Sequence, residues 1–174
     1  MSSNQLDGKG ITARAKRLRL VLTDNDGVLT DAGVYYSEKG EELRRYSLRD
    51  GMGVERLRDA GIATGIITRE DSGSVAKRAE KLKLPHLYLG VQDKRARLEQ
   101  IVKDTGLSIG EMAYIGDDVN DLEIIRIIGK EGLTAAPSDA MPEVKEAVHF
   151  VCSSKGGYGA FRDFAELILK AKGS

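Results

Sequence analysis

The sequence has 174 residues and a mass of 18.9 kDa, a length that suits one domain with its own hydrophobic core. Lys and Arg number 27, as do Asp and Glu, so the formal net charge is zero. This balance argues against nucleic acids and anionic membranes as partners. The single cysteine, Cys152, excludes an intrachain disulfide, and no apolar run approaches the ~18 residues of a membrane span. We therefore expect a cytoplasmic enzyme or regulator.

The first residues differ in composition from the rest of the chain. Residues 1–16 mix Ser, Asn, Gly, Gln and Lys without a hydrophobic period, and they contain no apolar stretch of the kind found in a secretory signal. We expect a flexible leader over residues 1–16 and a single domain over residues 17–174.

Apolar runs and helical patterns alternate along the domain. The apolar runs, which predict buried strands, cover residues 17–23, 62–68, 86–91, 112–115 and 132–136, with a weaker sixth at 149–152. Helical patterns cover residues 53–60, 72–84, 93–105, 121–128, 142–148 and 160–172. This alternation predicts an α/β fold, a doubly wound Rossmann-like parallel sheet. Residues 34–47 break the alternation and predict a β-hairpin that protrudes from the loop after the first strand, with no large cap domain.

Chemically active side chains follow four of the predicted strands. Asp24 and Asp26 follow the first strand, Thr68 ends the second, Lys94 comes after the third, and residues 116–121 (Gly-Asp-Asp-Val-Asn-Asp) follow the fourth. In open α/β sheets, ligands bind outside the carboxyl ends of the strands. Each of these pieces taken alone is more often structural, but their convergence indicates a site for a phosphoryl group.

The carboxylates at these strand ends predict a metal. Asp24, Asp26 and Asp117 cannot all stay ionised side by side without a cation, and oxygen ligands favour Mg²⁺. An isolated Asp-x-Asp-Gly is more often a solvated turn, and residues 116–121 could also begin a helix with favourable acidic residues. A calcium loop is excluded, because Gly33 stands where its acidic ligand belongs.

In this order, the four pieces resemble the haloacid dehalogenase superfamily of phosphohydrolases, over essentially the whole chain from Leu18 onward. Response-regulator receivers also place Asp, Thr and Lys around Mg²⁺, but their Lys comes last, whereas Lys94 precedes residues 116–121. Residues 22–31, 49–51, 116–121 and 156–162, together with the missing cap, resemble the capless subfamily of ulosonate phosphatases.

The resemblance implies a substrate and an assembly. The substrate would be a phosphorylated sugar acid, with 3-deoxy-D-manno-octulosonate 8-phosphate of lipopolysaccharide biosynthesis first and a nine-carbon ulosonate 9-phosphate second. The assembly would be a homotetramer in which hairpins form a central barrel and complete neighbouring active sites, with the glycine-rich segment at residues 156–157 able to reach one of them. A non-catalytic oligomerisation module associated with sugar-acid cytidylyltransferases is the other alternative; the intact Asp24, Asp26, Lys94 and Asp117 argue against it.

The resemblance also implies a role for each matching residue. Asp24 would be the nucleophile that forms an aspartyl phosphate, and Asp26 the general acid and base. Asp24, the backbone carbonyl of Asp26 and Asp117 would hold Mg²⁺. Thr68 and Lys94 would bind the phosphoryl oxygens, with Lys94 neutralising charge in the transition state.

Further residues would support the site or select the substrate. Asp118 and Asp121 are expected behind the ligands, Asp121 orienting the lysine. Arg69, Glu70 and Arg78 are the candidates for contacting the sugar acid. Octulosonate phosphatases tend to show Thr-Gly-Arg where this chain has Thr-Arg-Glu at residues 68–70, which fits the nine-carbon type better.

Overall fold

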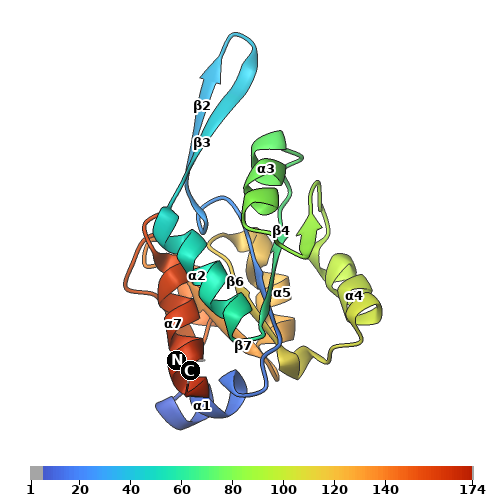
Figure 1. Cartoon of the computed structure of the whole chain (residues 1–174), viewed down its shortest axis with the longest axis vertical. Helices are drawn as coiled ribbons and strands as arrows, with labels where there is room; N and C mark the ends of the chain where they lie inside the picture. Colours follow the sequence, from blue (N-terminus) through green and yellow to red (C-terminus); the bar gives the residue numbers. More distant parts are fainter. Residues whose placement is uncertain (1–5, 174) are drawn as a thin grey trace.

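A single parallel sheet forms the centre of the molecule in the computed structural model, which describes residues 6–173. Its six strands lie in the order β5-β4-β1-β6-β7-β8 (Figure 1), and each neighbouring pair is parallel. The strands are β1 Leu20–Thr23, β4 Ala63–Ile67, β5 His86–Tyr88, β6 Met112–Ile115, β7 Leu133–Ala136 and β8 Phe150–Val151. The predicted doubly wound α/β fold is confirmed.

Helices cover both faces of the sheet. They are α1 Gly8–Ala15, α2 Leu48–Asp59, α3 Gly73–Lys81, α4 Lys94–Thr105, α5 Leu122–Ile128, α6 Pro142–Ala147 and α7 Ala160–Lys172, with short 3₁₀ turns at Ile109–Glu111 and Val119–Asp121. One apolar core joins α1, α2, α3 and α7 to the sheet, and the other joins α4, α5 and α6 to it. Val21 enters the first core, whereas Leu20 and Leu22 enter the second. Because both faces of β1 are buried, its sequence is continuously apolar.

The register of β1 determines where the site forms. Thr23, the last residue of β1, pairs with Ile66 of β4 on one side and with Ile115 of β6 on the other. The amide of Asp24 then donates to the carbonyl of Ile115 at 3.0 Å. The residues that follow β1, β4 and β6 are therefore brought together at one edge of the sheet.

The hairpin consists of β2 Thr30–Ser37 and β3 Gly40–Tyr46 and projects away from the layered body (Figure 1). It begins four residues before the predicted boundary at residue 34. Its pairing is irregular between Thr30 and Val34, and Ala32 lies at a φ of 59° in this stretch. Within residues 6–173, the hairpin is the largest excursion from the layers, as expected for a fold without a large cap.

Part of the predicted flexible leader is a packed helix. In α1, Ala15 is fully buried, and the Arg14 guanidinium donates to the carbonyls of Gly129 and Gly132 at 2.7 and 2.6 Å. A cation at this position stabilises carbonyls left without partners after a helix C-terminus. For residues 8–15 the leader prediction was wrong, because a few apolar residues without a helical period pack against the core and Arg14 adds its hydrogen bonds; residues 1–5 lie outside the described part of the chain.

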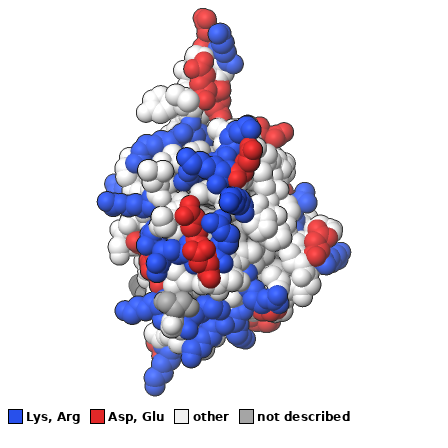
Figure 2. Space-filling model, in the orientation of Figure 1, with Lys and Arg blue, Asp and Glu red and all other residues white. Residues whose placement is uncertain are grey.

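Acidic and basic side chains are interspersed over most of the face drawn in Figure 2, and Lys and Arg gather at the end where α1 and the last turns of α7 lie. The projecting hairpin carries both signs of charge near its tip. Among the described helices, none is long and apolar enough to cross a membrane.

Candidate active site

A pocket opens at the carboxyl ends of the central strands. Its volume is about 200 Å³. The residues that line it come from the loops after β1, β4 and β6 and from the base of the hairpin: Asp24, Asp26, Ala32, Thr68, Arg69, Glu70, Asp117, Asp118 and Asn120. The sequence therefore identified seven of these nine residues as site candidates.

A buried charged cluster supports Asp24. The Lys94 ammonium lies 2.9 Å from Oδ2 of Asp24 and 2.6 Å from Oδ1 of Asp121. It also donates to the Tyr114 hydroxyl at 3.1 Å, and that hydroxyl donates to the same oxygen of Asp121 at 2.6 Å. Burial alone would lower the pKa of Lys94, but the two carboxylates outweigh it and raise the pKa, so the ammonium stays charged. Lys94 lies behind Asp24 and at the start of α4, which Asp93 caps by accepting from the amide of Ala96.

Three carboxylates of the site lie close enough to share a cation. Oxygen atoms of Asp24, Asp117 and Asp121 all lie within 4.8 Å of one another. Burial and the neighbouring carboxylates raise the pKa of Asp24 to about 7 and that of Asp117 to about 8. Asp121 has both oxygens engaged, one by Lys94 and Tyr114 and the other by the amides of Asp117 and Asp118. Asp24 and Asp117 are therefore the pair whose charge is least compensated.

The backbone around this pair leaves no room for a larger residue at position 27. Gly27 lies at a φ of 81°, and a Cβ there would lie 1.9 Å from Oδ2 of Asp117. The glycine thus lets the loop after β1 approach Asp117. Hard oxygen donors in close approach, with ionisation disfavoured in the absence of a cation, fit a Mg²⁺ site.

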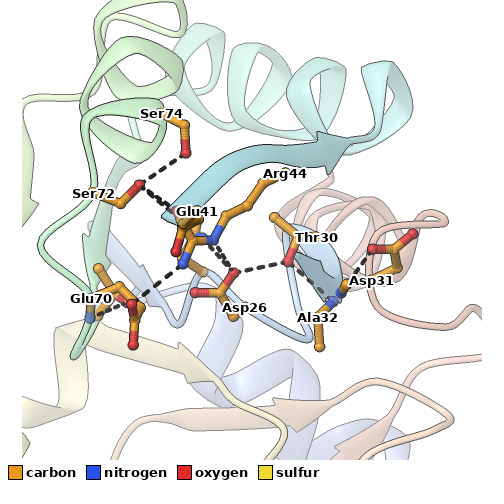
Figure 3. Close-up of polar contacts among 12 residues, drawn as sticks. Asp26, Thr30, Asp31, Ala32, Glu41, Arg44, Glu70, Ser72 and Ser74 are labelled. Atoms are coloured by element: carbon orange, nitrogen blue, oxygen red, sulfur yellow. Dashed lines mark hydrogen bonds and ion pairs between the residues drawn. The ribbon is translucent and has the colours of Figure 1, made fainter. Parts of the chain in front are cut away.

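Asp26 faces a different set of partners. Its Oδ1 accepts from Nε of Arg44 at 2.9 Å and from Oγ1 of Thr30 at 3.2 Å (Figure 3). The amide nitrogen of the Asn25 side chain donates to the same oxygen at 3.2 Å. Arg44 lies on β3, so the hairpin reaches the pocket.

The segment after β4 also lines the pocket. The Thr68 hydroxyl accepts from the amide of Glu70 at 3.2 Å. Arg69 is exposed and donates to the side chain of Gln92 at 3.3 Å. The Glu70 carboxylate lies 3.4 Å from Nη2 of Arg44. Asp118 is exposed at the rim, where it caps the 3₁₀ turn by accepting from the amide of Val119 at 2.6 Å.

The structure does not bring Arg78 into the pocket. Its guanidinium donates to the backbone carbonyl of Ser47 at 2.9 Å and lies 5.3 Å from the centre of the Tyr46 ring. A Cβ on Gly51 would lie only 2.7 Å from Nη2 of Arg78. Arg78 therefore joins α3 to the start of α2 and is not among the residues that line the pocket, so its contact with substrate stays a prediction that this placement does not support.

Sequence reasoning missed Arg44 and Tyr114. Tyr114 is fully buried in β6, and its hydroxyl is the polar atom of an otherwise apolar run, which is the signal that could have revealed it. Arg44 has no comparable signal, because its contact with Asp26 depends on how the hairpin packs against the loop after β1.

The glycine-rich segment near the C-terminus lies against this chain's own site loop. A Cβ on Gly156 would lie 1.9 Å from the carbonyl oxygen of Gly27, and one on Gly157 would lie 2.4 Å from the amide nitrogen of Asp31. The buried Asp50 carboxylate accepts from the amide of Gly159 at 3.2 Å, at the start of α7. These contacts give residues 49–51 and 156–162 a structural role beneath the hairpin.

Comparisons with known proteins agree with this geometry. Residues 88–160 match the model of a family described as haloacid dehalogenase-like hydrolases. The chain is 36% identical to 3-deoxy-D-manno-octulosonate 8-phosphate phosphatase from Haemophilus influenzae over 160 residues, which cover 92% of this chain and 87% of that protein. It is 33% identical to the enzyme of that name from Escherichia coli K12, over 94% of this chain and 85% of the relative. The chain belongs to the family of 3-deoxy-D-manno-octulosonate 8-phosphate phosphatases.

Solved structures of family members share the fold. The octulosonate 8-phosphate phosphatase from Moraxella catarrhalis, solved with magnesium, phosphate and KDO, superposes with a TM-score of 0.88 at 33% identity, over 94% of this chain and 92% of that one. A probable phosphatase of the YrbI family from Pseudomonas syringae gives a TM-score of 0.90 at 37% identity, over 95% and 92% of the two chains. The predicted resemblance to haloacid dehalogenase phosphatases is confirmed.

Proposed function

We propose that this chain is a Mg²⁺-dependent phosphatase that releases inorganic phosphate from 3-deoxy-D-manno-octulosonate 8-phosphate. The observation that carries the proposal is the pocket in which Asp24, backed by Lys94, lies beside Asp117 and Asp26 at the ends of β1 and β6. Members of the family are named for this substrate, and the Moraxella catarrhalis member contains magnesium, phosphate and KDO.

The proposed reaction has two half-reactions, both centred on Asp24. In the first, the Asp24 carboxylate attacks phosphorus and the bond to the sugar oxygen breaks, while protonated Asp26 gives its proton to the leaving alkoxide. In the second, Asp26 takes a proton from a water molecule that attacks the aspartyl phosphate, which releases phosphate and restores Asp24. Each residue thus returns to its starting protonation state after one turnover.

Lys94 and Thr68 serve the phosphoryl group in this proposal. Lys94 lies 2.9 Å from Asp24 and stays charged, so it offsets the negative charge that gathers around the reacting phosphorus. Thr68, at the pocket wall, offers a hydroxyl to a phosphoryl oxygen. Asp24, Asp117 and the backbone carbonyl of Asp26 would hold Mg²⁺, which neutralises phosphate charge and orients the group for in-line attack.

Arg69 and Glu70 are proposed to meet the sugar acid, because both line the pocket. The alternative substrate, a nine-carbon ulosonate 9-phosphate, rests on Glu70 in the Thr-Arg-Glu sequence. The relatives described above give it no support. The pairing of Glu70 with Arg44 also compensates part of its charge, which removes some of the repulsion that Glu70 would exert on a substrate carboxylate.

The proposal includes a homotetramer that packs through the hairpins. Tyr35, Tyr36 and Leu43 on the hairpin are 66%, 73% and 63% exposed, and apolar side chains on an isolated two-stranded ribbon favour association. That neighbouring subunits share active sites stays a prediction, and so does a cytoplasmic location.

A turnover screen tests the function. Purified protein with Mg²⁺ is given octulosonate 8-phosphate, a nine-carbon ulosonate 9-phosphate and glucose 6-phosphate, and released phosphate is measured with and without EDTA. We expect the highest kcat/KM for octulosonate 8-phosphate, with activity lost in EDTA and restored by Mg²⁺. Preference for the nine-carbon acid would overturn the substrate, and phosphorylation without turnover would indicate a receiver instead. Absence of both reactions would favour the non-catalytic module.

A further inference from the structure

The two oxygens of the Asp26 carboxylate have opposite environments. Oδ1 accepts three hydrogen bonds, from Arg44, Thr30 and Asn25 (Figure 3). Oδ2 is buried and has no hydrogen-bond partner among the described residues. A carboxylate oxygen without a partner in a buried position is costly unless it serves a ligand or a reaction. Because Asp26 lines the pocket and its Oδ1 already accepts three hydrogen bonds, Oδ2 is the oxygen left for proton transfer.

Arg44 is the one of the three donors that comes from β3. Asn25 directly precedes Asp26, and Thr30 begins β2 four positions after it, whereas Arg44 is separated from Asp26 by 18 positions and approaches from β3. The bond from Arg44 is also the shortest of the three and the one that carries a full positive charge, which makes it the strongest.

The guanidinium of Arg44 has no nitrogen left for substrate. Nε bonds Asp26, Nη1 donates to the hydroxyl of Ser72 at 2.8 Å and to Glu41, and Nη2 faces Glu70. The side chain is only 2% exposed. An arginine that is this enclosed acts through its partners and does not contact the phosphate.

We propose that Arg44 is a positioning residue: it holds Oδ1 of Asp26 so that Oδ2 faces the reaction, and it thereby makes proton transfer depend on the hairpin. The inference rests on the proposed function, because it uses Asp26 as the general acid and base. It adds Arg44 to the residues on which catalysis depends. Through one charge-assisted hydrogen bond, the hairpin of a chain positions the general acid and base of the same chain.

The two half-reactions depend on Oδ2 in different ways, which gives the proposal a test. A sugar alkoxide is a poor leaving group, so its departure needs the proton on Asp26. The p-nitrophenolate ion leaves without a proton, so the phosphorylation of Asp24 by p-nitrophenyl phosphate does not need Asp26. Hydrolysis of the aspartyl phosphate needs Asp26 as a base with either substrate. A misplaced Asp26 therefore slows both steps for an alkyl phosphate but only the second step for the aryl phosphate.

The experiment compares Arg44→Gln and Arg44→Lys with wild type by rapid mixing in Mg²⁺, using p-nitrophenyl phosphate and an alkyl phosphate that the wild type hydrolyses. For Arg44→Gln we expect kcat on the alkyl phosphate to fall about tenfold to a hundredfold with KM little changed, part of the ~10²–10⁴-fold that general acid–base catalysis supplies. With the aryl phosphate we expect a burst of about one nitrophenolate per site, followed by slow turnover, because hydrolysis of the aspartyl phosphate becomes rate-limiting. Arg44→Lys should recover part of kcat, because an ammonium still offers one charged donor.

Arg45→Gln is the matched control, because it removes an arginine from the neighbouring position of β3. Arg45 is 45% exposed in its side chain and bonds the carbonyl of Gly157 instead of Asp26. We expect no burst in this variant. An equal loss on both phosphates without a burst, a change confined to KM, or the same burst in Arg45→Gln would overturn the proposal. Circular dichroism and sedimentation check the fold and assembly of each variant, and Arg44→Lys serves if Arg44→Gln fails to fold.

Different measurements test the proposed substrate and the proposed role of Arg44. If wild type does not turn over octulosonate 8-phosphate, the substrate assignment fails. The comparison of aryl and alkyl phosphates in Arg44→Gln still reports on Asp26, because it needs no particular sugar acid.

Discussion

Asp24 and Asp26 are two residues apart in the sequence, but different regions of the molecule support them. Asp24 contacts Lys94, which Asp121 and Tyr114 hold within the central layers. Asp26 is held by Asn25 of the loop after β1 and by Thr30 and Arg44 of the projecting hairpin. The nucleophile is therefore supported by the buried core, whereas the acid and base is supported by the part of the fold that is least covered.

This difference indicates which substitutions should alter the chemistry at Asp24 and which should alter only the position of Asp26. The core around Asp24 is packed and buried, so a change there alters chemistry and metal binding together. The exposed side chains of the hairpin can be changed without disturbing the sheet, because Tyr35, Tyr36 and Leu43 face away from the body. Variants of the two regions should therefore separate loss of chemistry from loss of positioning.

The largest expected effect comes from Asp24→Asn. An amide cannot attack phosphorus, so turnover should fall to background with any phosphate ester. The fold should persist, because Lys94 keeps Asp121 and Tyr114 as partners. Activity is measured by phosphate release and folding by circular dichroism. Measurable turnover in a folded Asp24→Asn protein would remove Asp24 as the nucleophile.

Replacing Tyr35, Tyr36 and Leu43 together with Ser, Ser and Thr tests whether packing of the hairpin against a neighbouring subunit supports Asp26. We expect dissociation of the proposed tetramer in sedimentation and a fall in kcat of about tenfold or more on alkyl phosphates, since general acid–base catalysis contributes ~10²–10⁴-fold. Lys39→Ser, at the hairpin turn, is the control and should change neither. A variant that is monomeric but fully active would show that the hairpin needs no neighbour to hold Asp26.

The carboxylates of Asp24 and Asp117 should make the free energy of unfolding of the metal-free protein depend on pH. Burial and neighbouring carboxylates raise the pKa of Asp24 to about 7 and that of Asp117 to about 8, from 3.8. The folded protein then binds more protons than the unfolded chain between these limits, so the free energy of unfolding decreases as the pH rises through this window. Mg²⁺ binds the ionised carboxylates, so the stabilisation that it gives should increase with pH.

Thermal unfolding in EDTA and in Mg²⁺, at about pH 5.5 and about pH 8, measures this dependence. Asp117→Asn is the control, because it removes one of the two groups and should flatten the pH dependence in EDTA. A rise in the stability of the wild type relative to Asp117→Asn as the pH increases in EDTA would contradict the assignment of Asp117.

The smallest kinetic effect is expected for Arg78→Ala. The loss of its hydrogen bond to the carbonyl of Ser47 and its contact with Tyr46 should lower the free energy of unfolding by about 1–2 kcal/mol. Values of kcat/KM should change by the same small factor on sugar-acid and aryl phosphates. Lys77→Ala, an exposed neighbour on α3, should change neither stability nor rate. A loss of kcat/KM confined to the sugar-acid phosphate would show that Arg78 contacts the substrate.

Much of the fold and the inner part of the site could be predicted from the sequence. Alternating apolar runs and helical patterns predicted the six strands of the parallel sheet and the helices between them, because each element carries its own periodicity. The association of Asp24, Thr68, Lys94 and Asp117 followed from topology, since the carboxyl ends of parallel strands meet at one edge. Local sequence and a general rule of α/β sheets were enough for these residues.

Contacts that depend on the docking of separate elements were decided only by the tertiary structure. Arg14, Arg44 and Arg78 are ordinary arginines in polar segments, yet the first anchors α1, the second holds Asp26 and the third joins α2 to α3. Which of them reached the pocket depended on the irregular register of β2 and β3 and on the packing of α3. A long flexible side chain carries no periodic signal, so its partner is determined by the distance between backbones that lie far apart in the sequence.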